Sequence, residues 1–149
     1  MPNYEALDEI GQLFARALFS EFPNWESLAR FVTDQATGDS WIEIDIQQEG
    51  TDRALHLSTA KNEITIGFDG WHTHIGTFLG INVEESVATA MGIILDFIAE
   101  VRIVYVVYRA GAWLHSGFRF REMPLDPEPD TTTKIFSWRQ TYDREIETT

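Results

Sequence analysis

The amino-acid sequence predicts an α+β fold in which helices pack against an antiparallel sheet. Apolar residues recur at helical spacing near the start and in the middle of the chain, and elsewhere they alternate with polar residues as in strands. The alternating segments are joined by short connections, as in antiparallel hairpins. We therefore expect a single α+β domain over residues 1–149 with the element order ααβββαβββ.

The N-terminal part is expected to form two helices. Over residues 3–22 the apolar side chains share one helical face, the first turn is acidic, and Pro23 ends the helix. Asn24 is a suitable N-cap for a second helix that continues to Val32, before the break at Thr37-Gly38-Asp39.

Three alternating runs then predict three strands, over residues 42–47, 55–58 and 64–68. Their register places one set of apolar side chains against the helices: Ile42, Ile44, Ile46, Leu55, Leu57, Ile64, Ile66 and Phe68. The side chains of Glu43, Asp45 and Glu63 are expected to point to solvent, because a shift by one residue would bury a row of carboxylates.

A helix and three more strands complete the prediction. Asn82 is expected to cap a helix from Val83 to about Val101, whose broad apolar stripe suits a position across a sheet. The strands are expected over residues 103–108, 112–122 and 134–142. A Pro-rich loop at 124–131 precedes the last strand, and the C-terminal tail is expected to fray.

Composition narrows the class of protein. The chain has no cysteine, which excludes disulfides, thiolate metal sites and a cysteine nucleophile. The first residues lack the features of a signal peptide, and no run approaches the ~18 apolar residues of a membrane span. We expect a soluble, cytoplasmic protein.

The negative charge is concentrated in the middle of the chain. The formal net charge is −13, and the segment Asp34–Glu100 carries 12 acidic against 2 basic residues, a balance of −10. Such a surface attracts basic partners and repels nucleic acid and anionic membranes, although an acidic face also serves solubility alone. A basic protein is therefore the expected partner, with neither nucleic acid nor membrane bound.

The pair His72 and His74 is the main candidate for chemistry. In an H-x-H pattern on a strand both rings share one face and could hold a metal, with His56 or His115 as a further ligand. The spacing departs from the cupin pattern, because Gly67 lies one residue too close to His72. The favoured alternative is a rigid aromatic corner in which the imidazoles hydrogen-bond backbone carbonyls. We expect no metal and no cofactor.

Other catalytic arrangements are weaker. Glu43 and Asp45 share a strand face and could mimic a catalytic carboxylate pair, but any acidic strand produces this pattern. Nucleophile-elbow, Walker A and dinucleotide motifs are absent from the sequence. The C-terminal arginines are expected to pair with carboxylates across neighbouring strands rather than to bind phosphate.

Residues 41–76, with the stretches WIEIDI, EGTDRALHLST and above all EITIGFDGWHTHIG, resemble small bacterial immunity proteins encoded beside polymorphic or contact-dependent toxins. The resemblance is strongest over GFDGWHTH and covers about a quarter of the chain. It implies a compact, acidic, non-catalytic α+β protein that blocks a cognate toxin, often a basic nuclease, by covering or disabling its active site.

The leading hypothesis is an immunity protein that binds a basic toxin through an acidic surface studded with aromatic residues. The residues expected to contact the toxin are Glu43, Asp45, Glu63, Asp69, Trp71, His72 and His74. Trp71 is expected at a loop tip, where it or Trp41 would fill a pocket of the partner. Two alternatives stay open: a small metal-dependent enzyme that uses His72 and His74, and a non-catalytic structural module.

Overall fold

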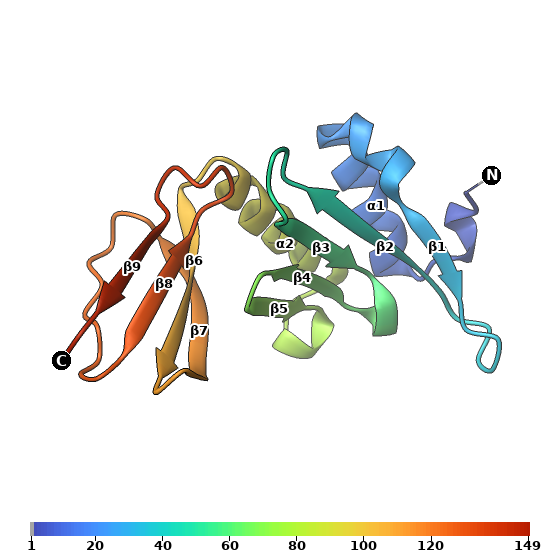
Figure 1. Ribbon diagram of the computed structural model, residues 1–149. Coiled ribbons are helices and arrows are strands. Elements are labelled where there is room, and N and C mark those ends of the chain that lie inside the picture. Colours follow the sequence, from blue (N-terminus) through green and yellow to red (C-terminus); the bar gives the residue numbers. More distant parts are fainter. Residues whose placement is uncertain (1) are drawn as a thin grey trace. The chain divides into compact units, whose positions relative to one another are not determined.

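The structure is a computed structural model that describes residues 2–149, and it confirms the α+β class (Figure 1). The helices of the described chain are η1 Tyr4–Ala6, α1 Glu9–Glu21, η2 Pro23–Leu28, η3 Ala60–Asn62, η4 Thr77–Leu79 and α2 Val83–Ile98, of which the η elements are 3-10 helices. Its strands are β1 Arg30–Thr33, β2 Ser40–Gln47, β3 Ala54–Ser58, β4 Ile64–Phe68, β5 Trp71–Ile75, β6 Arg102–Arg109, β7 Ala112–Phe120, β8 Thr132–Phe136 and β9 Arg144–Glu147.

The strands form two antiparallel sheets, where the sequence predicted one. The first sheet has the order β1-β2-β3-β4-β5 and the second the order β7-β6-β8-β9. Beyond β5 the chain enters α2, and β6 then pairs with β7 and β8. The chain divides into two compact units with a boundary between Gly92 and Ile93, which lies inside α2. A single domain over residues 1–149 stays a prediction.

The core of the first unit follows the predicted register. All eight apolar residues assigned to the inner face of β2, β3 and β4 are buried, which confirms the alternation. Helix α1 contributes Ile10, Phe14 and Leu18 to this core. Its N-cap is Asp8, whose carboxylate accepts a hydrogen bond from the backbone N–H of Gly11 at 2.7 Å. Asp45 is exposed, and Glu43 is half-buried beside its cross-strand partners.

The expected second helix is largely wrong. Residues after Pro23 form only the short helix η2, and strand β1 starts at Arg30. Phe31 pairs with Ile42 in β2, and Val32 pairs with Trp41. Aromatic and β-branched side chains favour such a strand when β2 is available for backbone hydrogen bonding, because these side chains pack well on a pleated surface. Cross-strand pairing therefore overrides the helical spacing at this point.

The expected aromatic corner at Trp71, His72 and His74 is also wrong, because these residues form the regular strand β5. Asp69 and Gly70 make a two-residue hairpin turn between β4 and β5, with a positive φ of 52° at Asp69. An Asp-Gly pair is typical of such tight turns. The strand leaves His72 and His74 exposed instead of buried against carbonyl groups.

In the second unit the expected last strand is shorter and the tail is ordered. Strand β8 ends at Phe136, and the tail forms β9, whose Ile146 pairs with Thr133.

Asn82 caps α2 as expected, since its side-chain oxygen accepts a hydrogen bond from the N–H of Glu85 at 2.7 Å. No helix in the described residues is long and apolar enough to cross a membrane.

Candidate functional site

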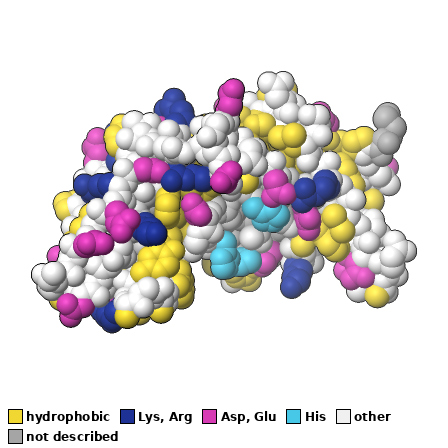
Figure 2. Space-filling model, viewed as in Figure 1, with side chains coloured by type: hydrophobic (Ala, Val, Ile, Leu, Met, Phe, Trp, Pro, Cys, Tyr) yellow, Lys and Arg dark blue, Asp and Glu magenta, His cyan; other side chains and the backbone are white. Residues whose placement is uncertain are grey.

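The outward face of the five-stranded sheet collects most of the polar side chains singled out above. Helix α1 lies behind this sheet in Figure 1, and no helix within residues 2–92 covers its other face. We call this surface the histidine face and define it by the outward side chains of Arg30, Glu43, Asp45, His56, Thr65, His72 and His74, together with Gly67. Figure 2 shows histidine side chains here beside acidic and basic ones.

The strand register arranges the histidine face in rows. Arg30 lies opposite Glu43, and Asp45 lies opposite His56 on the next strand. The second row continues from His56 across Gly67 to His72. Because side chains directly opposite each other on one face are within contact distance, each row joins neighbouring strands through their side chains.

Asp45 is the centre of a charged cluster on this face. Its Oδ1 lies 2.7 Å from Nδ1 of His56, and its Oδ2 accepts a hydrogen bond from Nη1 of Arg30 at 2.9 Å. Arg30 also reaches Oε2 of Glu43 at 3.4 Å, and Glu43 accepts a hydrogen bond from Nε1 of Trp41 at 3.1 Å. The acidic outer face of β2 is thus partly neutralised by neighbouring strands.

The contacts in this cluster lower the pKa of Asp45 and determine which ring nitrogen of His56 carries a proton. The hydrogen bond from His56, and after it that from Arg30, lowers the pKa of Asp45 below its ordinary value in spite of partial burial. An ionised carboxylate only accepts hydrogen bonds, so Nδ1 of His56 carries the proton that points at Asp45. The Nε2 atom of His56 has no partner among the described residues and is left to solvent or a ligand.

His74 is held in a similar way on the edge strand β5. Its Nδ1 lies 2.8 Å from Oε1 of Glu63 and 3.0 Å from Oγ1 of Thr65. Glu63 therefore lies beside the histidine face although it precedes β4. A carboxylate that holds Nδ1 sets the ring orientation and leaves Nε2 as the ring nitrogen for a further partner.

His72 completes the row beside a gap in the surface. Its ring contacts the edge of the His74 ring, with 5.2 Å between the ring centroids. Gly67 lies between His72 and His56, and a Cβ atom at Gly67 would be 3.7 Å and 3.8 Å from their Cβ atoms. Since glycine has no side chain, backbone forms the floor between the two histidines.

Two of the residues predicted for partner binding lie away from the histidine face. Trp71 alternates to the opposite side of β5 and pairs with Phe68, so its half-buried ring belongs to the core side of the sheet. Asp69 lies in the β4–β5 turn, where its carboxylate is 3.9 Å from Nε of Arg53. The other five are brought together: Glu43, Asp45, Glu63, His72 and His74.

The expected link between His72, His74 and a further histidine is met in part. His56 shares their face, whereas His115 lies on β7 of the second sheet and contacts Glu128 at 2.8 Å. Over residues 2–149, no three His, Asp or Glu side chains are placed to hold a metal ion. The arrangement offers imidazole nitrogens and carboxylates for hydrogen bonding from several strands at once.

Arg30 and the role of His56 are the parts of the site that sequence reasoning missed. Arg30 falls inside the expected second helix, and nothing local marks it as a neighbour of Glu43. For His56 a signal exists, because its alternation with Leu55 and Leu57 places it on the same face as the acidic residues if the strands pair in order. A comparison of the chain with protein family models, curated proteins and solved structures finds no match.

Proposed function

We propose that this protein is an immunity protein that binds and neutralises a cognate basic bacterial toxin domain, such as a nuclease, through the histidine face. One observation carries the proposal: five of the seven residues expected to contact the toxin lie together beside or on one polar sheet face that no helix of the same unit covers. The resemblance over GFDGWHTH supports the class, and this motif supplies both His72 and His74.

Charge explains how such a partner is attracted. The first unit carries 15 acidic against 4 basic residues, a balance of −11, whereas the second carries 9 against 7, a balance of −2. A field of this sign raises the association rate of a basic protein and is screened over ~8 Å at physiological ionic strength. It also repels nucleic acid and anionic membranes, so neither is a proposed partner.

The histidine face itself contributes more to the choice of partner than to long-range electrostatic attraction. Arg30 offsets Glu43 and Asp45, so much of the unbalanced charge of this unit lies in turns, at Asp34, Asp39, Glu49 and Asp52. A docked toxin would meet fixed donors and acceptors on the sheet, and complementary fixed groups select a partner and its orientation. The proposed mechanism is occlusion of the toxin in the cytoplasm, without catalysis.

The test is a comparison of two triple variants with the same change of charge. The first variant changes Glu43, Asp45 and Glu63 to lysine, and the control changes to lysine Glu9, Glu21 and Glu84, which are exposed on the two α-helices. Each is assayed for survival of bacteria that express the cognate toxin, and for association rate with that toxin at low and high salt. Circular dichroism and thermal unfolding check that both variants fold.

We expect the first variant to lose protection and to associate at least ~10-fold more slowly than the control, with a rate that depends less on salt than that of the unmodified protein. The control is slowed by its lower net charge but still protects. Equal rates and equal protection for both variants would show that the interface lies elsewhere.

A further inference from the structure

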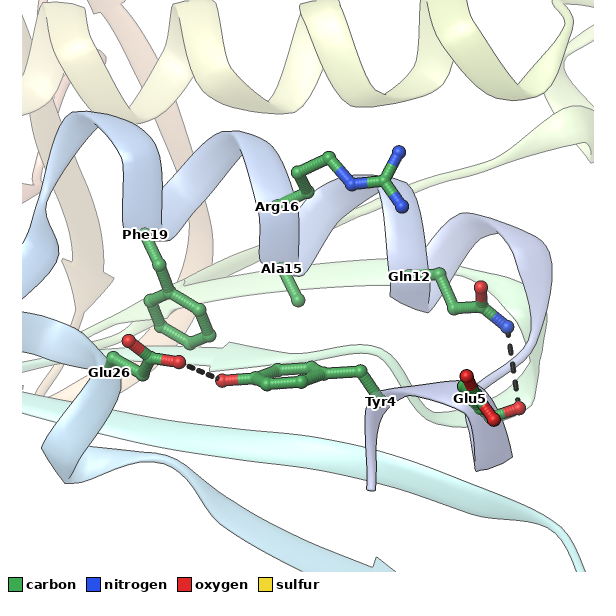
Figure 3. Close-up of a pocket in the computed structure, with 7 residues that line it drawn as sticks. All are labelled: Tyr4, Glu5, Gln12, Ala15, Arg16, Phe19 and Glu26. Carbon is green, nitrogen blue, oxygen red and sulfur yellow. Dashed lines mark hydrogen bonds between the residues drawn. The ribbon is translucent and has the colours of Figure 1, made fainter. Parts of the chain in front are cut away.

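A recess in the first unit lies apart from the histidine face, on the side of helix α1 (Figure 3). It has a volume of about 300 Å³ and is lined by Tyr4, Glu5, Gln12, Ala15, Phe19 and Glu26. This volume is at the lower end of the range for small-molecule pockets, so it suits a single side chain rather than a large ligand.

The walls of the recess are aromatic. The rings of Tyr4 and Phe19 approach each other edge-on with 6.3 Å between centroids, and the buried Ala15 of α1 also lines the recess. The Tyr4 hydroxyl donates a hydrogen bond to Oε1 of Glu26 at 2.5 Å. Burial and this contact raise the pKa of Tyr4 to about 12, so the phenol remains a hydrogen-bond donor to the Glu26 side chain.

Several hydrogen-bond acceptors of the recess have no donor bonded to them among the described residues. Glu5 has no hydrogen bond or ion pair through its carboxylate among the described residues, and Oε2 of Glu26 is likewise unbonded. Gln12 uses its amide nitrogen on the carbonyl oxygens of Leu7, at 2.8 Å, and Glu5, at 3.5 Å, which leaves its own oxygen available. A guest that satisfies these groups must bring several N–H donors.

Arg16 also lines the recess, but Figure 3 shows its guanidinium group turned away from Tyr4 and Glu26. The position inside the recess therefore stays unfilled by a cation of the chain itself. Two carboxylates outweigh the single guanidinium at its border, so the local balance is negative.

We propose that this recess binds the side chain of an arginine presented by another molecule. A guanidinium group carries five N–H donors in a plane, is weakly hydrated and stacks on aromatic rings, which matches acceptors at the ends and aromatic walls between them. A lysine ammonium lacks the plane and the donor count. The proposal does not rest on the immunity function, since its test uses a free arginine derivative.

The probe is Nα-acetyl-arginine methylamide, added to the isotope-labelled protein and followed by NMR. The neutral isostere Nα-acetyl-citrulline methylamide and the anionic Nα-acetyl-glutamate methylamide are titrated in parallel. Because the site is open to water, a dissociation constant of order 1 mM is expected for the arginine probe. The side-chain amide of Gln12 and the backbone amides of Ala15 and Phe19 should shift and saturate together.

Three variants test whether negative charge at the recess strengthens the binding of the arginine probe. Glu26→Gln keeps an acceptor for the Tyr4 hydroxyl and should weaken arginine binding by ~3–10-fold, and Glu5→Gln should act in the same direction. Arg16→Gln removes the competing cation and should tighten binding by ~2–3-fold. Glu5 has no side-chain contact to lose, so the Glu5 variant remains informative if Glu26→Gln disturbs the fold.

Selective, saturable shifts with arginine and at least ~10-fold weaker binding of citrulline would support the proposal. Equal responses to arginine and citrulline, saturation by the glutamate probe, or weaker arginine binding by Arg16→Gln would each overturn it. Loss of arginine binding with intact protection from the toxin would reject the recess and leave the proposed function standing.

Discussion

Arg139 donates a hydrogen bond from Nε to Oε1 of Glu100 at 2.9 Å, which ties the end of α2 to the loop between β8 and β9. Thr141 donates a second bond to the same oxygen at 2.8 Å. Glu100 is only 1% exposed and has a positive φ of 57°, in the position after a helix where glycine is usual. Its N–H bonds the carbonyl of Phe97, as in a Schellman motif. The bonds to the carboxylate therefore hold a residue whose backbone conformation is unfavourable.

The first prediction is that Glu100→Gln lowers the free energy of unfolding by ~2–4 kcal/mol, because the buried hydrogen bonds lose their charged acceptor. Burial alone raises the pKa of Glu100, but bonds from Ser137, Thr141 and Arg139 outweigh it and hold the pKa below its ordinary value of 4.5. The stabilisation is thus present above the ordinary pKa and is lost as pH falls through the lower folded pKa.

Urea unfolding at pH 7 and at about pH 3 measures this effect, since the gap between the two proteins should narrow in acid. Glu122→Gln is the control, because the Glu122 side chain is 87% exposed. An unchanged free energy of unfolding for Glu100→Gln would contradict the prediction.

The second prediction concerns Asp45 and His56. His56→Ala should raise the pKa of Asp45 toward its ordinary value of 3.8, because the hydrogen bond from His56 is the largest cause of its lowering. Carbon-13 NMR of the carboxylate during an acid titration measures this pKa directly. His115→Ala, on the other sheet, should leave it unchanged.

Stability should follow the same contact, but weakly. Asp45 contributes above its ordinary pKa and loses the contribution as pH falls through the folded pKa. Both side chains are over two-fifths exposed, at 44% for Asp45 and 42% for His56, so solvent screens the pair and the change is expected below ~1 kcal/mol. A pKa of Asp45 that does not move in His56→Ala would show that Arg30 alone sets it.

The third prediction compares two glycines in strands. A Cβ atom at Gly117 would come within 2.4 Å of the Tyr105 hydroxyl and 2.5 Å of its ring, so Gly117→Ala should force this ring to move and cost ~1–3 kcal/mol. At Gly67 the nearest atoms are 3.7 Å away or more, so Gly67→Ala should change stability by less than ~0.5 kcal/mol. Thermal unfolding of both variants checks the order, and equal losses would contradict it.

The fourth prediction is that the purified protein carries no stoichiometric transition metal at His72 and His74. Elemental analysis finding about one zinc, iron or manganese per chain would refute it. Since both side chains are exposed, replacing them with alanine should cost less than ~1 kcal/mol, a smaller loss than buried histidines would cause. Thr65→Ala is the control for the loss of stability, because it removes only the contact of Thr65 with His74 and leaves the contact of Glu63 with His74 in place.

The strands β2, β3 and β4 could be predicted because each buries isoleucine, leucine or phenylalanine at every second position, which is a local signal. Strand β1 has only four residues, and strand β9 has a single apolar one, Ile146, so their formation depends on pairing with distant neighbours. Local sequence carries too little of that information.

The candidate site also has a part that local sequence predicts and a part that it does not. That Glu43 and Asp45 share a face follows from their spacing, and so does the shared face of His72 and His74. The contact of Arg30 with Asp45 depends on where β1 pairs, which is a long-range fact that no local pattern determines. The opposite face for Trp71 follows from alternation with His72 and His74, but only once residues 71–75 are assigned to a strand instead of a corner.

The bare backbone at Gly67 has a practical consequence for a chain without cysteine. A cysteine introduced there would be the sole thiol in the molecule and would project from the floor between His56 and His72. Its ordinary clearance allows the side chain, so a fluorophore or cross-linker could be attached at one chosen point with no background labelling. Such a reagent would convert an encounter on this surface into a covalent adduct, whose partner mass spectrometry could then read.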